Sequence, residues 1–220
     1  NMSAKYKSPS FLLPNELNTS ANPATGTGVN SLYSMNFDGT EYITAGLLSE
    51  YISLSAPTTL TVSAWIKTSS NNTQGIVGSG ANNSSGLIFR ISSGEITFGV
   101  ITTVTTSRII TTTANVNDGN WHHVVGTYDS EGDASGNTLY LYVDGTQIGS
   151  NTGNRGIYPF DNYPLFIGAV GAGNSQVNPF IGKIDEVAIF NRALTDGTGN
   201  TVNEIAALYD GTGSNIRPSN

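Results

Sequence analysis

The sequence contains no cysteine, which excludes disulfide bonds, thiolate zinc sites and a cysteine nucleophile. Charged residues are also scarce, at 11% of the 220 residues. There are 9 basic residues against 16 acidic ones. The basic residues form no cluster, so the phosphate contacts of a nucleic-acid-binding protein are not expected. No apolar run approaches the roughly 20 residues of a membrane-spanning helix. The composition therefore predicts no nucleic-acid partner and no membrane insertion.

The first thirty residues lack both a regular hydrophobic pattern and the apolar core of a signal peptide. Either such a peptide was removed or the protein reaches the outside by another route. Three prolines interrupt residues 1–30, which we therefore predict to be an N-terminal arm. Within the arm, the apolar residues 11–13 have two interpretations. They pack on their own domain, or they dock on another protein subunit.

Glycine, serine, threonine and asparagine are abundant, and short alternating segments recur about every ten residues. In residues 59–68 the apolar side chains alternate with polar ones, as in a strand with one buried face. Residues 121–129 and 138–143 predict two longer strands, the second closed by the turn Asp144-Gly145. One helix is predicted near the C-terminus, where Thr201 and Glu204 match a capping box and Gly211 suits a C-terminal cap. The pattern predicts an all-β, two-sheet antiparallel sandwich with one short C-terminal helix.

Five motifs stand in the order found in laminin-G-like domains of the concanavalin A-like lectin/glucanase superfamily: MNFDGTEYI, LTVSAWIKT, GNWHHVVGTYD, LYLYVDGTQIG, and FIGKIDEVAIFNRALT followed by EIAALYDG. The sequence resembles that family over about four-fifths of its length. The resemblance implies a jelly-roll sandwich of two curved antiparallel sheets. We expect this domain to span residues 31–211, followed by a polar tail at 212–220.

Catalytic groups are not apparent. A glycosidase needs two carboxylates at a fixed separation, and the hydrolases of this superfamily carry Glu-x-Asp-x-x-Glu on a strand. Neither Asp129-x-Glu131-x-Asp133 nor Asp185-Glu186 fits that pattern. The only histidines, His122 and His123, are neighbours on a predicted strand and point to opposite faces, so they cannot serve one site. We predict that the protein is not an enzyme.

The resemblance implies a structural calcium ion. Asp38 of the FDG motif and Asp185 of the IDE motif match positions that hold calcium in similar domains. The alternative is that Asp38 is a turn former and Asp185 caps an edge strand. A second candidate is the loop DSEGD, which supplies acidic residues at the first three ligand positions of a calcium loop but has Tyr140 at the twelfth.

A sugar site needs exposed rings and amides, because rings stack on sugar faces and amides bind hydroxyls. Residues 155–164 combine both, so we predict ligand contacts at Tyr158, Phe160, Asp161, Asn162 and Tyr163. The alternative is that these rings close one end of the core. The loops GANNSSG and GAGNSQVN are further polar places for a ligand, whereas the two tryptophans, Trp65 and Trp121, are expected in the core.

The function that follows is a non-catalytic surface protein. By a small margin the sequence favours a structural or adhesion component of a larger assembly, such as a phage capsid decoration or tail appendage, with glycan binding and with subunit contacts through the arm. The alternative is a secreted or cell-surface carbohydrate-binding module, and the remote alternative is a glycoside hydrolase. The expected location is a virion surface or the outside of a cell.

Overall fold

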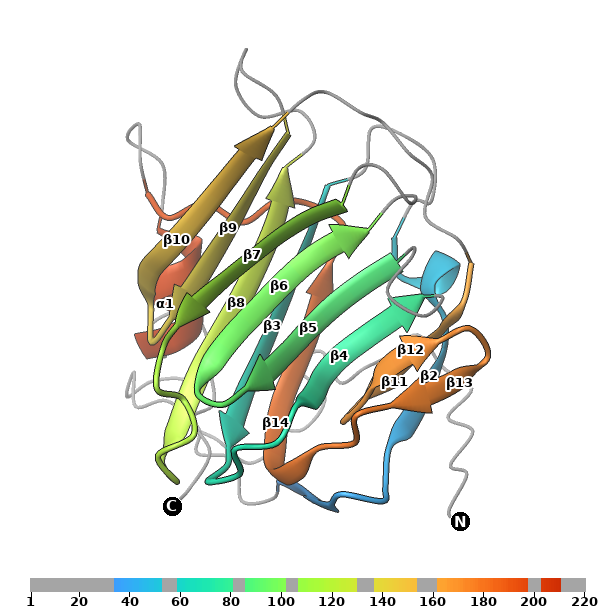
Figure 1. Ribbon diagram of the computed structural model, residues 1–220. Helices are drawn as coiled ribbons and strands as arrows, with labels where there is room; N and C mark the ends of the chain where they lie inside the picture. The colour runs from blue at the N-terminus through green and yellow to red at the C-terminus, as the bar shows by residue number, and fades with distance from the viewer. Residues whose placement is uncertain are drawn as a thin grey trace, which may run out of the picture.

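The computed structural model describes residues 34–52, 59–80, 86–101, 107–129, 137–153, 162–197 and 203–210. These residues form a sandwich of two six-stranded sheets in which every neighbouring pair of strands is antiparallel (Figure 1). The predicted all-β jelly-roll architecture is confirmed. The arm at 1–30, the tail at 212–220 and the domain limits at 31 and 211 lie outside the described residues.

The strands of each sheet come from distant parts of the chain. The first sheet has the spatial order β1 (Met35–Asp38), β14 (Ile181–Phe190), β3 (Leu60–Lys67), β8 (Trp121–Asp129), β9 (Asn137–Val143) and β10 (Thr146–Gly153). The second has the order β2 (Ile43–Leu47), β11 (Pro164–Ile167), β4 (Gln74–Gly80), β5 (Gly86–Ser92), β6 (Glu95–Ile101) and β7 (Ser107–Thr113). A short 3-10 helix at Leu48–Glu50 follows β2.

Alternation along the strands sends one set of apolar side chains between the sheets. In β3 the buried inner residues are Leu60, Val62, Ala64 and Ile66, as the sequence predicts. Residue 126 of β8 is glycine because the Phe98 ring of β6 occupies the space of a side chain: an added Cβ would lie 2.2 Å from that ring. The core is therefore continuous across both sheets.

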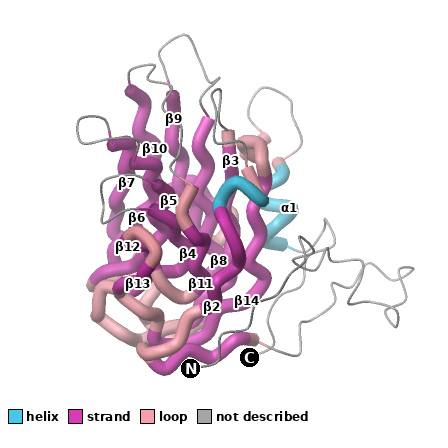
Figure 2. The backbone as a smooth tube through the Cα atoms, turned by 90° about the vertical axis from the view of Figure 1, so that its right-hand side faces the viewer, coloured by secondary structure: helices cyan, strands magenta, loops and turns pink. Residues whose placement is uncertain are grey.

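A second apolar layer covers the outer face of the first sheet. The helix α1 (Glu204–Asp210) packs there, and Figure 2 shows it on the opposite side of the molecule from the hairpin of β12 (Val170–Ala172) and β13 (Ser175–Val177). Val125 and Tyr142 of the sheet form a buried cluster with Leu194 and Ile205. Strand β3 is consequently buried on both faces, which alternation alone did not indicate.

The start of α1 is fixed by polar contacts. The Asn203 Oδ1 atom accepts a hydrogen bond from the Ala206 N–H at 2.7 Å, as an N-terminal cap does. The Glu204 carboxylate binds both terminal nitrogens of Arg192, at 2.8 and 2.5 Å, and accepts the Thr195 N–H at 3.1 Å. The predicted capping box pairs Thr201 with Glu204. In the structure Glu204 binds Arg192 and Thr195, and Thr201 lies outside the described residues.

The segment GAGNSQVN, expected to be a polar loop, is instead the hairpin β12–β13. It lies against β4, and the glycines at positions 75, 78 and 171 let the two backbones approach closely. A Cβ on Gly75 would lie 2.3 Å from the Ala169 carbonyl carbon, and one on Gly78 would lie 2.8 Å from the Val170 Cα. The glycines of β4 therefore provide the surface on which the hairpin packs.

The two sheets are joined along one side. Strands β7 and β10 are edge strands of different sheets, and they contact each other. The Asn151 side-chain amide of β10 donates a hydrogen bond to the Ile109 carbonyl of β7 at 2.8 Å. In the described part of the chain no helix is long and apolar enough to cross a membrane.

Candidate functional site

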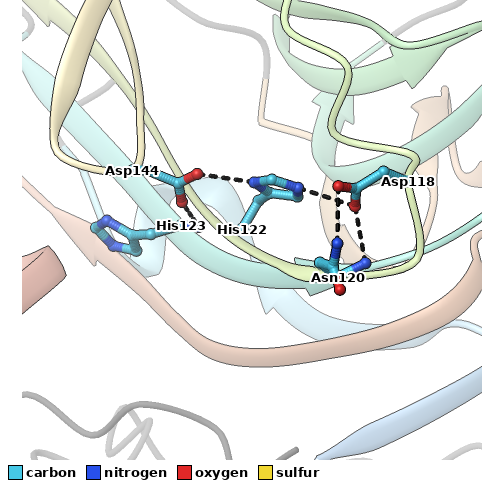
Figure 3. A network of polar contacts seen from close by, with 5 residues as sticks. All are labelled: Asp118, Asn120, His122, His123 and Asp144. Carbon is cyan, nitrogen blue, oxygen red and sulfur yellow. Dashed lines mark hydrogen bonds and ion pairs between the residues drawn. The ribbon is translucent and has the colours of Figure 1, made fainter.

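Four polar side chains meet where β8 begins and the turn between β9 and β10 lies beside it (Figure 3). The His122 Nδ1 atom lies 2.8 Å from the Asp144 Oδ2 atom, and its Nε2 atom lies 3.1 Å from the Asp118 Oδ1 atom. The Asn120 side-chain amide and backbone N–H both donate to Asp118, at 2.9 and 2.8 Å. We call Asp118, Asn120, His122 and Asp144 the His122 cluster.

Local sequence explains how the cluster forms. The dipeptide Asp144-Gly145 makes the turn between β9 and β10, and both residues have positive φ, 50° and 76°. This turn places the Asp144 carboxylate so that its second oxygen accepts the His123 N–H at 2.9 Å. At the other end, Asp118 is four residues before His122 and its loop is held by a hydrogen bond from the Gly119 N–H to the Thr68 carbonyl, 2.9 Å.

The pKa values of the cluster shift in the directions expected for an ion-pair network. Hydrogen bonding to Asp144 raises the pKa of His122, and this outweighs the opposite effect of burial. Hydrogen bonds from Asn120 lower the pKa of Asp118 to about 2. Burial alone would raise the pKa of Asp144, but the hydrogen bonds from His122 and His123 lower it. The two carboxylates thus favour the protonated form of His122 more than water does.

The cluster is built for holding strands together and does not resemble a hydrolytic site. A glycosidase leaves the space between its two carboxyl groups open for the sugar and, in inverting enzymes, for a water molecule. Here the His122 ring fills the space between Asp118 and Asp144 (Figure 3). His123 points to the other face, where its Nε2 atom lies 2.8 Å from the Ser63 hydroxyl and its ring stacks near Trp65 and Tyr209.

Sequence reasoning separated the two histidines correctly but missed the partners of His122. The sequence contains two signals of these partners: an aspartate four residues before the histidine, and an Asp-Gly turn. The turn was not informative by itself, because Asp-Gly is also favoured for its backbone conformation. Only the strand register shows that this turn returns beside His122, because Val143 pairs with Val124. The predicted core position of Trp65 is confirmed by its 6% exposure, whereas Trp121 is half-buried.

The structure does not bring the two predicted calcium ligands together. Asp38 pairs with Ile181 at one end of the β1–β14 ladder, and Asp185 comes four residues later in β14, opposite Trp65. At about 3.3 Å per residue, their Cα atoms are separated by about 13 Å along the sheet. Asp38 Oδ1 accepts the N–H and hydroxyl of Thr40, at 2.8 and 2.7 Å. Among the described residues, no group of three or more His, Asp or Glu side chains could hold a metal ion.

One further carboxyl group has an unusual pKa. Glu186 lies in a β-bulge of β14 between Asp185 and Ala188, and its φ of 48° is left-handed. Burial, and secondarily the charge of Asp185, raises the pKa of Glu186 to about 7. The Glu186 N–H donates to the Asp185 Oδ1 atom at 2.9 Å. The bulge therefore holds a carboxyl group that is easily protonated.

Of the five predicted ligand contacts, Tyr158, Phe160 and Asp161 lie outside the described residues. Asn162 and Tyr163 stand just before β11 and hold the 3-10 helix. The Asn162 Oδ1 atom accepts the Ser49 N–H at 3.1 Å, and the Tyr163 carbonyl accepts the Leu48 N–H and the Ser79 hydroxyl, at 3.1 and 3.0 Å. These contacts leave the exposed Asn162 amide nitrogen and the half-buried Tyr163 ring as groups that a ligand could use.

Comparison with known proteins gives one family match. A model of the concanavalin A-like lectin/glucanases superfamily, of the laminin-G type, matches residues 37–198. No curated protein sequence matches the chain.

Similar solved structures include binding domains of botulinum neurotoxins. Another similar structure is of botulinum neurotoxin type C, whose cell entry depends on interaction with two ganglioside molecules. It is 16% identical with a TM-score of 0.52, over 72% of this chain and 36% of that one. Two others are binding domains of botulinum neurotoxin DC, in complex with rat synaptotagmin II and with SialylT. Both are 17% identical, with TM-scores of 0.50 and 0.52, over 70% of this chain and 36% of those. The chain spans about a third of the length of these proteins, and at such identity the likeness shows the fold.

Proposed function

Because the chain belongs to the laminin-G-like family of the concanavalin A-like lectin/glucanases superfamily, we propose that it is a non-catalytic module that binds glycans. The observation that carries the non-catalytic part of the proposal is that the ionisable groups of the His122 cluster, one imidazole and two carboxylates, are bound to one another. Fold by itself does not decide function. The proposal therefore rests on the chemistry of particular residues.

Support for the absence of catalysis comes from the carboxylates. Glu186, with a pKa near 7, has the protonation behaviour of a general acid. A hydrolase would also need a second carboxylate across the scissile bond, about 5–9 Å away. The carboxylate beside it in the sequence is Asp185, which accepts the N–H of Glu186 itself and is its neighbour in the same bulge. Asp118 and Asp144 are held by His122.

Support for binding comes from the similar solved structures. They are binding domains, and their recorded ligands include gangliosides, SialylT and a protein receptor. The present chain corresponds to only about a third of those proteins, so their ligands define a class to be tested. A glycan is the ligand class that the ganglioside dependence of one of these proteins and the SialylT complex of another support.

The test is retention on an immobilised panel of glycans, combined with measurement of newly released reducing ends. We expect the folded protein to be retained by a subset of glycans and to release no reducing ends. The heat-unfolded protein, with the same composition and charge, is the control. Release of sugar by the folded protein would contradict the non-catalytic assignment, and a panel without any retained glycan would contradict glycan binding.

The proposal places the module on an outer surface, as a secreted, cell-surface or virion component. The more specific role in a phage-like assembly rests in part on the N-terminal arm, which lies outside the described residues. That role stays a prediction. Its test is removal of residues 1–30, which should abolish incorporation into particles or change the oligomeric state.

Calcium at Asp38 and Asp185 also stays a prediction. The register separates these residues, so a site at either one would need oxygen ligands from other groups. The prediction expects heat on calorimetric titration with calcium and a lower melting temperature, Tm, after chelation. The Asp38→Asn variant should lose both effects if Asp38 is a ligand. Absence of both effects in the unaltered protein would contradict the prediction.

A further inference from the structure

The outer face of the first sheet carries a straight row of four side chains across four neighbouring strands. The register aligns Asn36 of β1 with Lys183 of β14, Lys183 with Lys67 of β3, and Lys67 with Trp121 of β8. We call these four residues the lysine row. Directly opposite residues share a face of the sheet, and the neighbouring residues Phe37, Ile66 and Ile184 belong to the core, so the row faces away from it.

The row brings two positive charges together at directly opposite positions of β14 and β3. Directly opposite residues of an antiparallel pair have Cβ atoms about 5 Å apart, and like charges at that separation are unfavourable. Neither Lys67 nor Lys183 forms an ion pair with any described residue, whereas Arg192 has Glu204. This occurs in a chain with a net charge of -7, in which acidic groups are the common ones.

The neighbouring carboxylates form no ion pair with the lysines of the row. Asp38 and Asp185 lie on the same face as the lysine row, each two residues along its strand from a member of the row. Asp38 is opposite Ile181, and Asp185 is opposite Trp65. Asp38 accepts hydrogen bonds from Thr40, and Asp185 from the Glu186 N–H. Asp118, in the loop before Trp121, is held by Asn120 and His122. Each of these carboxylates is thus hydrogen-bonded to a group other than the two lysines.

The remaining members of the row suit a sugar. Trp121 is half-buried, so part of its indole ring reaches the surface, and Asn36 is exposed with an amide that can both donate and accept. An aromatic ring stacks on the apolar face of a sugar, and an amide binds its hydroxyls. Ammonium groups between these two contacts are placed to bind a carboxylate.

We propose that the lysine row is the binding site for a carboxylate-bearing sugar, held by Lys67 and Lys183 at its carboxylate and by Trp121 at its ring. The proposal rests on the proposed function, since it names the ligand class and the surface of that glycan-binding module. A bound carboxylate removes the repulsion between the two ammonium groups, so binding and stability are linked. Binding should weaken as the salt concentration rises.

The experiment compares acidic oligosaccharides, both sialylated and uronic-acid-containing, with their neutral parent sugars, using the fluorescence of Trp121 as the readout. Trp65, the other tryptophan, is 6% exposed and should respond little. We expect the acidic sugars to bind and their neutral parents to bind at least tenfold more weakly. Lys67→Gln and Lys183→Gln should each weaken binding by about tenfold, the loss of one charged hydrogen bond.

The Lys183→Glu variant separates a binding site from a merely structural pair. A carboxylate opposite Lys67 replaces repulsion by attraction, so Tm should rise by about 1–4 °C while binding of the acidic sugars is lost. Arg90→Gln is the matched control, because it removes one positive charge from β5 in the other sheet and should leave binding unchanged. The Trp121 variants lack the fluorescent ring, so their binding is measured by retention on immobilised acidic glycans. Trp121→Leu should weaken binding by about fivefold, and Trp121→Phe should keep most of it.

The outcomes distinguish this proposal from the one on which it rests. Equal binding of acidic and neutral sugars, or undiminished binding by Lys183→Glu, would overturn the lysine row as the site while leaving glycan binding in place. If neither acidic nor neutral sugars bind the unaltered protein, both proposals fail.

Discussion

His122 connects two segments that are far apart in the chain. It lies between Asp118, in the loop before β8, and Asp144, in the turn after β9, and its side chain is only 16% exposed. The closest contact is the 2.8 Å hydrogen bond to Asp144. Charge-assisted hydrogen bonds of this kind contribute more to stability than neutral ones, provided that the histidine is protonated.

This dependence on protonation predicts how stability changes with pH. The pKa of His122 is raised above its ordinary value of 6.5, so its contribution is complete below that value and is lost as pH rises through the folded-state pKa. The pKa values of Asp118 and Asp144 are lowered from 3.8, so their contribution is lost as pH falls through the folded-state values, about 2 for Asp118. The cluster should stabilise the fold most between about pH 4 and pH 6.5.

We therefore expect His122→Gln to lower the free energy of unfolding by about 1 kcal/mol at pH 6, and by less at about pH 8.5. In Tm this corresponds to a shift of about 3 °C at the lower pH. Thermal unfolding of both proteins across this range measures it. A difference in Tm that stays constant with pH would contradict a contribution from the protonated imidazole. Asn120→Ala is a comparison that removes the side-chain donor from Asp118 and keeps both the backbone N–H of residue 120 and the histidine.

At the scale of the element, the hairpin β12–β13 packs on the part of β4 where glycines leave room for another backbone. Gly75 and Gly78 of β4 lie under the backbone of residues 169–170. An added methyl group at either position meets backbone atoms, which cannot move aside as a flexible side chain does. The glycines of β4 are thus required by the close approach of a neighbouring segment.

Gly75→Ala should accordingly destabilise the protein by about 1–3 kcal/mol, because its Cβ would lie 2.3 Å from the Ala169 carbonyl carbon. Denaturant unfolding gives the value. Gly173→Asn is the matched control at the tip of the same hairpin: no atom lies within 4 Å of the added Cβ, and asparagine tolerates the φ of 68°. Equal losses in both variants would mean that the close packing on β4 is unimportant.

The helix α1 gives a second prediction at this scale. Asn203→Ala removes the acceptor of the Ala206 N–H and should cost about 1 kcal/mol, whereas Asn203→Asp keeps that acceptor. The ring of Tyr209 in α1 stacks on Trp65 at a centroid distance of 5.8 Å. Loosening of the helix end should therefore shift the Trp65 emission to longer wavelength in the first variant and leave it unchanged in the second.

Strand positions and their inner faces could be predicted because a period of two in the sequence maps directly onto a sheet. The hairpin β12–β13 could not, because the pattern GAGNSQVN is rich in turn-forming residues and its contact is made by backbone atoms. The lysine row was also hidden. Its four residues come from segments between residues 36 and 183, and only the register of three strand pairs places them side by side.

At the scale of the whole molecule, the two sheets pack face to face, and one contact between a ring and a glycine shows how closely. Phe98 of β6 fills the space above Gly126 of β8, and both positions belong to the inner faces. Packing of this density leaves no room for an added methyl group. The family match over residues 37–198 covers both of these strands, so the contact lies within the framework that the resemblance correctly predicted.

Gly126→Ala should therefore destabilise the whole sandwich by about 1–3 kcal/mol, since its Cβ would lie 2.2 Å from the Phe98 ring. The double variant Gly126→Ala with Phe98→Leu should lose less than the sum of the two single changes, because the smaller side chain makes room for the methyl group. A double-mutant cycle by denaturant unfolding measures this coupling. Strict additivity would show that the two residues do not share the space.

The join between β7 and β10 determines where one copy of this protein could extend the sheet of another. The edge strands β7 and β10 contact each other and are linked by Asn151, so neither edge is open to a strand from another chain. In the two six-stranded sheets, the remaining edges are β1 and β2, on the opposite side of the sandwich. Addition of a strand from another chain, in an ordered polymer or in aggregation, is thereby directed to one side. Two copies that meet through this one side would form a closed pair, whereas a linear polymer would need a second contact surface on each copy.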